Sequence, residues 1–419
     1  MLNLPRMTLV KQSFDTSGLH TVHEIKQSIM SQCVSLHIEK QIKPGQSIAI
    51  TAGSRGITNI SGILKTLCDY FKELGANPWI VPAMGSHGGA TAEGQAALLA
   101  KKGILEQSIG APIRSSMDVV SLGTGKKGFP VYIDALASKA DHIVVVNRVK
   151  PHTKFEGPLQ SGLFKMMVVG LGKHKGAEVA HQAALSDGFP TVLSTAGNVI
   201  LNHCPILFGL AIVENSYHQV HSLKILLPRQ IESEEKKLLR LASDLVPKIP
   251  LNDIDLLIVD QIGKDISGSG MDTKVIGRDR EILGTLIKSP RIKRIFVRDL
   301  SQGSDGNGFG IGLADFTTNR LIKAINLSKT YVNAQTAMSP EKAALPMYFE
   351  SDAAAITEAF NSIGNPSPQI TKLVRIRDTL NLEFLYVSES LVGELPRSAC
   401  IVGEPQKIEF DDCDNLLNF

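Results

Sequence analysis

The chain has 419 residues, of which 43% are hydrophobic and 20% are charged, a balance typical of globular proteins. Its 44 basic and 41 acidic residues leave a formal net charge of +3, too small to indicate nucleic-acid binding. No apolar run has the length of a membrane span, and the N-terminus lacks the layout of a secretory signal. The five cysteines are scattered without a CxxC pair, which is typical of reduced thiols. We therefore expect a cytoplasmic protein with no nucleic-acid and no membrane partner.

Short β-branched runs alternate with helical patterns through the first half of the chain, which predicts a largely parallel sheet covered by helices. We expect strands over 47–53, 78–84, 142–150 and 206–215, and helices over 58–75, 91–102 and 229–246. The last of these helices has the charge pattern of a solvated surface helix. The stretch PKIPLND after it reads as a linker, because prolines and polar residues separate two structured regions.

A second unit is predicted after this linker. We expect strands over 253–262 and in RIKRIFVRDL, helices near 316–329 and 351–363, and an acidic surface extension in the tail FDDCDNLLNF. The predicted fold class is α/β, with two α/β domains, residues 1–250 and 251–419, and a substrate or cofactor cleft between them.

Four polar, glycine-rich segments each follow a predicted strand directly. They are GSRG at 53–56, GSHGG at 85–89, RVKPHT at 148–153 and GKDISGSGMD at 263–272. In open α/β sheets, ligands bind beyond the carboxyl ends of the strands, so we expect these loops to meet at one rim.

Three side chains in these loops can do chemistry. A guanidinium at Arg55, between small residues, suits a carboxylate or a phosphate, although a surface arginine is an equal reading. His87 is flanked by glycine and alanine, so its ring is accessible for acid/base work, or it caps the helix near Thr91. His152 is likewise either an acid/base or a residue that stabilises a turn.

Lys165 stands inside the apolar run LFKMMVV, where an unpaired ammonium is costly. It must reach water, find a partner, or lose its charge, so it is a nucleophile, a covalent cofactor anchor, or a lysine whose amine reaches solvent at a helix end. His174 and His181 lie seven residues apart on a predicted helix and so roughly on one face. Either could bind a metal, or both could be ordinary, partly exposed residues.

The segments GSHGGATAEG, NRVKPHTKFEGPLQSGLFKMM and GLGKHKGAEVAH occur in this order over roughly 45–215. In order and spacing they resemble the nickel-dependent lactate racemase family, and more closely its homologues of unassigned substrate. The resemblance implies a cytoplasmic isomerase, a racemase or epimerase of a 2-hydroxy acid. It also implies a nickel pincer nucleotide, pyridinium-3,5-bisthiocarboxylic acid mononucleotide nickel, which dedicated helper enzymes make and which is covalently tethered.

By position, the resemblance places the tether on Lys165 and the nickel ligand on His181, with His174 as the less favoured candidate. It places the two acid/base histidines on His87 and His152. The implied reaction is reversible hydride transfer, with one histidine on each side of the reacting carbon. The N-terminal domain would bear cofactor and catalytic residues, and the C-terminal domain would close over the site.

The implied substrate contacts are Arg55 for the carboxylate and Lys274 from the second domain. The sequence departs from the family at two positions, since Ala52 stands where an acid is expected and Met271 where a glutamine is expected. These departures indicate a substrate other than lactate. Two alternatives remain at this stage, a lysine-based Schiff-base lyase or aldolase, and a non-catalytic nucleotide-binding homologue.

Overall fold

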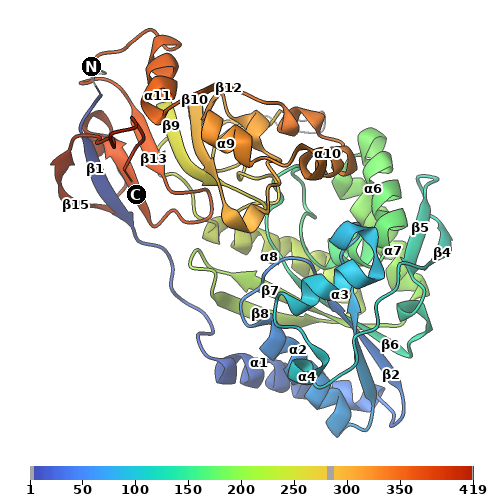
Figure 1. Cartoon of the computed structure of the whole chain (residues 1–419). Coiled ribbons are helices and arrows are strands. Elements are labelled where there is room, and N and C mark those ends of the chain that lie inside the picture. Colours follow the sequence, from blue (N-terminus) through green and yellow to red (C-terminus); the bar gives the residue numbers. More distant parts are fainter. Residues whose placement is uncertain (1–3, 281–286, 418) are drawn as a thin grey trace. The chain divides into compact units, whose positions relative to one another are not determined.

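The computed structural model describes residues 4–280, 287–417 and 419 (Figure 1). The chain divides into two compact units. The N-terminal unit is Asp15–Val246, and the C-terminal unit is Pro247–Phe419 together with the chain up to Phe14. Both units combine helices with a main sheet, so the predicted α/β class is confirmed.

The N-terminal unit is built on a sheet with the strand order β3-β2-β6-β7-β8. Its strands are β2 (Ser47–Ala52), β3 (Asn77–Pro82), β6 (His142–Arg148), β7 (Ile206–Glu214) and β8 (Val220–Leu226). The first four run parallel, and β8 pairs with β7 in the antiparallel sense. The parallel strands are nearly continuous apolar runs, as expected of strands buried on both faces.

Helices cover both faces of this sheet. The apolar sides of α1 (Val22–Ser35) and α2 (Ile60–Glu73) share one core cluster with strand residues. On the other face, Leu163 of α5 (Leu163–Lys165) and Ile231 of α8 (Ile231–Leu245) approach Gly209 of β7 so closely that a methyl group there would clash with Leu163. The helical segment that carries Lys165 is therefore clamped onto the sheet.

The unit has further α-helices and a second, two-stranded sheet. They are α3 (Ala92–Ala100), α4 (Glu106–Ile109), the antiparallel pair β4 (Val119–Thr124) and β5 (Pro130–Asp134), α6 (Lys173–Asp187) and α7 (Phe189–His203). A π-helix over Met166–Gly170 joins α5 to α6. Such π-helical insertions are rare and occur frequently at functional sites.

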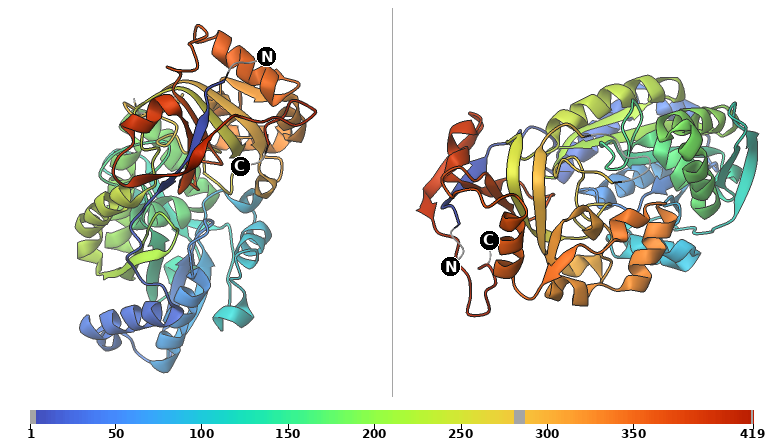
Figure 2. Two further views of the ribbon diagram at one scale, coloured as in Figure 1. Left: turned by 90° about the vertical axis from the view of Figure 1, so that its left-hand side faces the viewer. Right: turned by 90° about the horizontal axis from the view of Figure 1, so that it is seen from above.

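The C-terminal unit holds the larger sheet, with the order β12-β11-β10-β9-β13-β14-β1-β15 (Figure 2). Its strands are β1 (Met7–Gln12), β9 (Asp253–Ile262), β10 (Arg291–Leu300), β11 (Phe316–Thr318), β12 (Met347–Phe349), β13 (Leu373–Ile376), β14 (Phe384–Ser388) and β15 (Ala399–Gln406). The N-terminal strand β1 pairs with β14 and β15. It therefore belongs to this sheet, although a division at residue 250 would assign it to the other domain.

The described part of the C-terminal unit has three α-helices, α9 (Asn319–Ala324), α10 (Leu327–Thr336) and α11 (Asp352–Asn361), besides short 3-10 turns. The single helix predicted near 316–329 is wrong, because its first residues form β11 and the β-branched Thr318 caps α9 instead of continuing it. Among all described helices, none is both long enough and apolar enough to cross a membrane.

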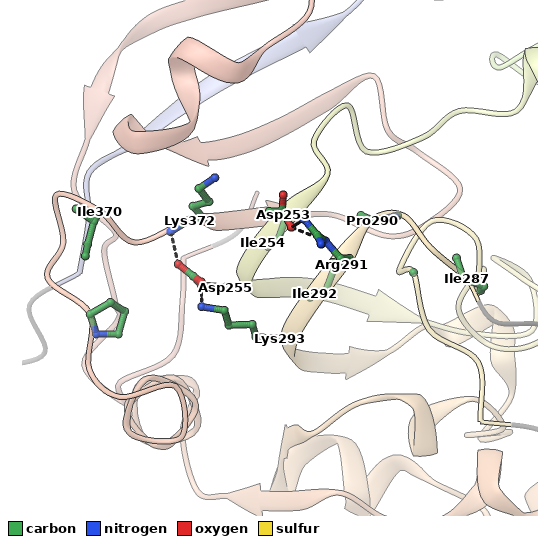
Figure 3. Close-up of a pocket in the computed structure, with 12 residues that line it drawn as sticks. Asp253, Ile254, Asp255, Ile287, Pro290, Arg291, Ile292, Lys293, Ile370 and Lys372 are labelled. Carbon is green, nitrogen blue, oxygen red and sulfur yellow. Dashed lines mark hydrogen bonds and ion pairs between the residues drawn. The ribbon is translucent and has the colours of Figure 1, made fainter.

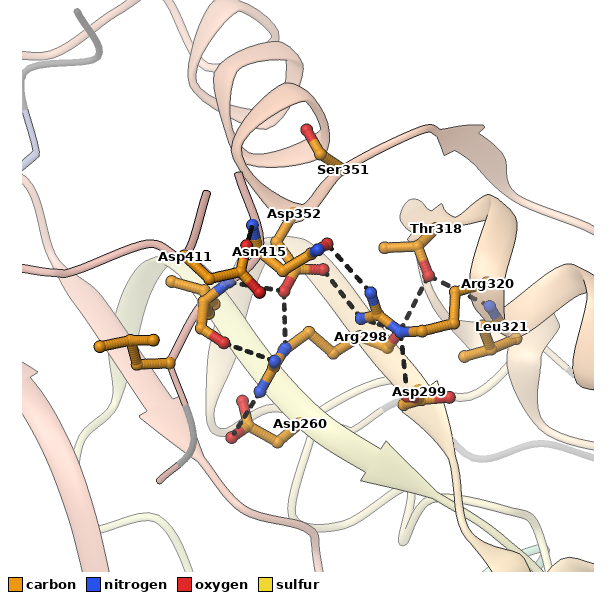
Figure 4. Close-up of polar contacts among 12 residues, drawn as sticks. Asp260, Arg298, Asp299, Thr318, Arg320, Leu321, Ser351, Asp352, Asp411 and Asn415 are labelled. Atoms are coloured by element: carbon orange, nitrogen blue, oxygen red, sulfur yellow. Dashed lines mark hydrogen bonds and ion pairs between the residues drawn. The ribbon is translucent and has the colours of Figure 1, made fainter. Parts of the chain in front are cut away.

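The C-terminal tail is anchored in its unit (Figure 4). Leu416 is only 2% exposed, and its backbone N–H donates to the buried Asp352 carboxylate at 2.9 Å. Arg298 binds the same carboxylate through Nε at 2.7 Å and the carbonyl oxygen of Leu416 at 2.6 Å. Most described residues of the tail are exposed, as expected of a surface extension, but Leu416 is buried and the Arg298 guanidinium bridges the tail to a buried acid.

Candidate active site

Three of the four glycine-rich loops lie at one edge of the N-terminal sheet. β2, β3 and β6 are parallel, with β2 between the other two, so their carboxyl ends share that edge. The loops that follow these strands carry Arg55, His87 and His152. The fourth loop follows β9 and belongs to the C-terminal unit.

Lys165 ends the short helix α5, and its amine lies 2.6 Å from Nε2 of His152. The side chain keeps some accessible surface, but protein surrounds the amine closely enough that desolvation lowers its pKa to about 7. The Arg55 and Lys154 cations lower this pKa further. Glu156, the acidic residue nearest in sequence, is exposed. Lys165 therefore avoids the free-energy cost of a buried ammonium, because its amine loses its charge near neutral pH.

The hydrogen bonds of His152 fix its tautomer. Its Nδ1 accepts the backbone N–H of Lys154 at 3.0 Å, and a neutral imidazole has one acceptor and one donor nitrogen. Nε2 therefore carries the proton and donates it to Lys165, which must accept through the lone pair of an uncharged amine. Desolvation and the neighbouring Lys165 hold the pKa of His152 well below its usual value, which agrees with a neutral ring.

His181 on α6 joins this group through a row of aromatic rings. The His152 ring stacks on Phe155 with centroids 4.3 Å apart, Phe155 stacks on Phe189 at 4.6 Å, and Phe189 meets the edge of His181 at 5.0 Å. Nδ1 of His181 is buried and has no hydrogen-bond partner among the described residues. Desolvation, then the Lys154 and Lys165 charges, lower the pKa of His181 to about 3. A neutral imidazole with an unsatisfied nitrogen is suited to bind a metal ion. His174, by contrast, is exposed.

His87 has the opposite tautomer to His152. Its Nδ1 lies 2.7 Å from the carbonyl oxygen of Met84 and 3.3 Å from Oγ of Ser54. A carbonyl only accepts, so Nδ1 must carry the proton, and the lone pair remains on Nε2. The side chain is exposed at the end of β3, and it does not cap α3, because Thr91 does. His87 is thus oriented as a base at Nε2.

Arg55 belongs to a group of cations at the same edge. Its charge and that of Arg148 act on Lys102, whose pKa is lowered first by burial and then by these two arginines. Arg148 forms an ion pair with Glu214, whereas Arg55 makes no hydrogen bond or ion pair within the described residues. The exposed Arg55 guanidinium is therefore available to an anion such as a carboxylate.

Sequence reasoning missed two charged residues beside Lys165. Lys154 is only 7% exposed, and its charge acts on Lys165, His152 and His181. Glu235, on the helix predicted to be solvated, is 1% exposed and accepts the backbone N–H of Phe164 at 3.1 Å. Desolvation raises the pKa of Glu235 to about 7. Lys154 lies within the segment NRVKPHTKFEGPLQSGLFKMM and Glu235 lies outside the recognised segments, but only the tertiary packing reveals the burial of either residue.

The two candidates from the second domain lie in the C-terminal unit. Met271 is fully buried in its hydrophobic core, so it is a packing residue in the place where the family resemblance led us to expect a polar one. Lys274 is partly buried, and its backbone N–H donates to Asp272 at 3.0 Å. Its contact with substrate stays a prediction.

The C-terminal unit also has a pocket of about 720 Å³ at the amino ends of β9, β10 and β13 (Figure 3). Four of its five charged side chains form two pairs, and the fifth, Lys372, pairs with Glu394 outside the pocket. Arg291 binds Asp253 at 2.6 Å, and Lys293 binds Asp255 at 2.7 Å. Ligand sites in α/β sheets lie at the opposite, carboxyl ends of the strands, so this pocket is not the candidate site.

Two solved proteins match parts of this structure, and the first of them has a similar fold. The lactate racemase apoprotein from Thermoanaerobacterium thermosaccharolyticum has a TM-score of 0.53 at 13% sequence identity, over 85% of this chain and 91% of that one. A structural-genomics protein from Thermotoga maritima has a TM-score of 0.47 at 16% identity, over 67% of this chain and 72% of that one. No curated protein matches the sequence significantly.

Fold and site thus define a mixed α/β protein with two main sheets, in the architecture of lactate racemase. Residues 5–189 match the family described as the lactate racemase N-terminal domain. The resemblance drawn from the sequence is confirmed. The matched range contains five of the predicted site residues, Arg55, His87, His152, Lys165 and His181.

Proposed function

We propose that this protein is a racemase or epimerase of a 2-hydroxy acid and carries a nickel pincer nucleotide tethered through Lys165. The observation that carries the proposal is the contact of the Lys165 amine with His152, beside His181 in one aromatic row. An uncharged amine is the form that can be acylated, and acylation removes the cost of a charge in this apolar segment.

The residues present fit the cofactor. His181 offers a neutral ring with a buried nitrogen that has no partner in the described part of the chain, which is what a single protein ligand to nickel requires. Among the described residues, no three His, Cys, Asp or Glu side chains are grouped to hold a metal ion. The other nickel ligands would therefore come from the cofactor itself.

The pincer nucleotide, when bound, supplies a reversible hydride acceptor for the carbon that bears the substrate hydroxyl. The chain supplies binding and proton transfer. Arg55 would bind the substrate carboxylate through paired hydrogen bonds. His87 would take the hydroxyl proton at Nε2 from one enantiomer, and His152 would do so for the other. For that role, Nδ1 of His152 must release the Lys154 backbone N–H, because this hydrogen bond now fixes the proton on Nε2.

The proposal is tested by the mass of protein produced together with the cofactor-forming helper enzymes and nickel. The intact mass should exceed the sequence mass by one cofactor, and the modified peptide should contain Lys165. Lys165→Ala should lose the adduct and the activity, whereas His181→Ala should keep the organic adduct and lose nickel. Fully active protein with an unmodified Lys165 would refute the proposal.

An uncharged lysine beside a histidine also suits a second function, a Schiff-base lyase or aldolase. In that case the unmodified protein would be active without nickel. Borohydride would then trap a carbonyl substrate on Lys165, whereas in a racemase the acylated Lys165 forms no imine and no substrate would be found on it.

A further inference from the structure

A buried polar network lies under the turn that carries His87. Gln95 of α3 is fully buried, and its side-chain amide donates to the carbonyl oxygens of Gly85 at 2.9 Å and of His87 at 3.3 Å. One nitrogen therefore binds both ends of the three-residue turn Gly85–His87. The side-chain oxygen of Gln95 accepts a hydrogen bond from Nζ of Lys173 at 3.3 Å.

Lys173 is fully buried at the start of α6 and connects this network to two strands, β3 and β5. Its ammonium donates to the carbonyl oxygen of Pro82 at the end of β3 at 2.5 Å, and lies 3.1 Å from the buried carboxylate of Asp134 at the end of β5. Its backbone has φ of +55°, a left-handed conformation that is costly for a side chain of this size. The surrounding contacts hold Lys173 in this strained conformation.

The backbone that follows the turn is also closely packed. Gly88 has φ of +70°, and a Cβ there would lie 2.5 Å from the backbone of Gly94 on α3. The next residues thus pack directly on the helix that presents Gln95. The His87 ring is oriented by Met84, whose carbonyl fixes the proton on Nδ1, and this contact requires the turn geometry that Gln95 holds.

We propose that Gln95 is a positioning residue. Supported by the buried Lys173–Asp134 pair, it holds the Gly85–His87 turn so that His87 keeps its proton on Nδ1 and its lone pair on Nε2. In the described hydrogen bonds, Gln95 contacts the backbone of the turn and not the His87 ring. It therefore acts on the ring only through the backbone of the turn. The catalytic consequence rests on the proposed racemase function, whereas the effect on the tautomer does not.

The test uses nitrogen-15 NMR of histidine side chains in the full-length protein without cofactor, with the His87 signals assigned from the His87→Asn spectrum. The wild type should show the Nδ1–H tautomer at His87. Gln95→Met keeps length and volume but removes both donors, and Gln95→Glu keeps an acceptor for Lys173 while removing the amide. Both should shift His87 toward the Nε2–H tautomer and leave His203 unchanged. The exposed Gln182→Met on α6 is the matched control and should change nothing.

Cofactor-loaded enzyme then gives a second measurement. Gln95→Met should lower kcat for racemisation by at least tenfold, with KM, cofactor content and nickel content unchanged. An unaltered His87 tautomer in both Gln95 variants would overturn the proposal, and so would an altered tautomer at every histidine, which would indicate general unfolding. If the wild type racemises no 2-hydroxy acid, the proposed function fails, while the tautomer result still decides the role of Gln95.

Discussion

The amine of Lys165 lies 2.6 Å from Nε2 of His152, while Nδ1 of the same ring accepts a backbone N–H from Lys154. These two contacts together require an uncharged lysine, because a ring whose second nitrogen already accepts can only donate through Nε2. The direction of the Lys165 pKa, lowered to about 7 by desolvation, gives the same answer independently. The cofactor-free protein thus holds Lys165 ready for acylation.

Lys165 should therefore react unusually well with a reagent that modifies free-base amines, such as an arylating reagent. With a pKa of about 7 instead of 10.5, its free-base fraction at pH 8 is on the order of a hundredfold larger than that of an ordinary lysine. We expect trinitrobenzenesulfonate to modify Lys165 at pH 8 before the exposed Lys139, with a rate that falls between pH 8 and pH 6. Peptide mass spectrometry against time measures both sites. Preferential modification of Lys139 at pH 8 would show that Lys165 is protonated or inaccessible.

Local sequence patterns predicted the N-terminal sheet well. The runs of Ile, Val and Ala in β2, β3, β6 and β7 are bounded by glycine, proline or polar residues, and such runs specify buried parallel strands. The loops at their carboxyl ends follow from the topology of a parallel sheet. The site loops of Arg55, His87 and His152 were therefore accessible to sequence reasoning, but their individual roles came from the family resemblance.

Features that depend on distant partners were not predictable. The pairing of Met7 with Ser388 joins the two ends of the chain, and no local pattern encodes it. The charge pattern of α8 concealed the burial of Glu235, since acidic residues on a helix are normally exposed. The Lys173–Asp134 pair similarly joins a helix start to a strand end. Such pairs become visible only when the fold brings them together.

His87→Ala and His152→Ala should each abolish racemisation, by a factor of at least 10²–10³, because each base serves one enantiomer and neither can replace the other. The tether and nickel should be retained in His87→Ala, since His87 contacts neither Lys165 nor His181 in the described hydrogen bonds. Circular dichroism assays that start from each enantiomer separately measure the loss. A near wild-type rate in both directions for either variant would contradict the two-base scheme.

Arg55→Lys should weaken binding of a 2-hydroxy acid about tenfold or more. An ammonium is a point charge and cannot form the two parallel hydrogen bonds that a guanidinium makes with a carboxylate. Isothermal titration with cofactor-loaded protein and a panel of 2-hydroxy acids gives the affinities. Arg114→Lys, at an arginine that stacks on Trp79, serves as control. Equal affinities for wild type and Arg55→Lys would remove Arg55 from the substrate site.

Glu235 should make the stability of the N-terminal unit depend on pH. Its carboxyl caps the helix that carries Lys165, and desolvation raises its pKa from 4.5 to about 7. Between these values the folded state binds more protons than the unfolded state, so this group's stabilisation is complete below pH 4.5 and is lost as pH rises through 7. Glu235→Gln cannot ionise and still offers an oxygen to the backbone N–H of Phe164. It should match the wild type near pH 5 and exceed it at pH 8 by up to roughly 3 kcal/mol.

Trp79 is the only tryptophan of the chain and is buried in β3, so its fluorescence during urea unfolding reports on the N-terminal unit alone. The exposed Glu178→Gln on α6 is the control for loss of one negative charge, and it should follow the wild type at both pH values. If Glu235→Gln and the wild type lose the same stability between pH 5 and pH 8, the Glu235 carboxyl is not the titrating group. If Glu235→Gln is less stable at pH 8, the carboxylate is needed as a charged cap for the first turn of the Lys165 helix, because an anion at a helix N-terminus then outweighs its burial cost.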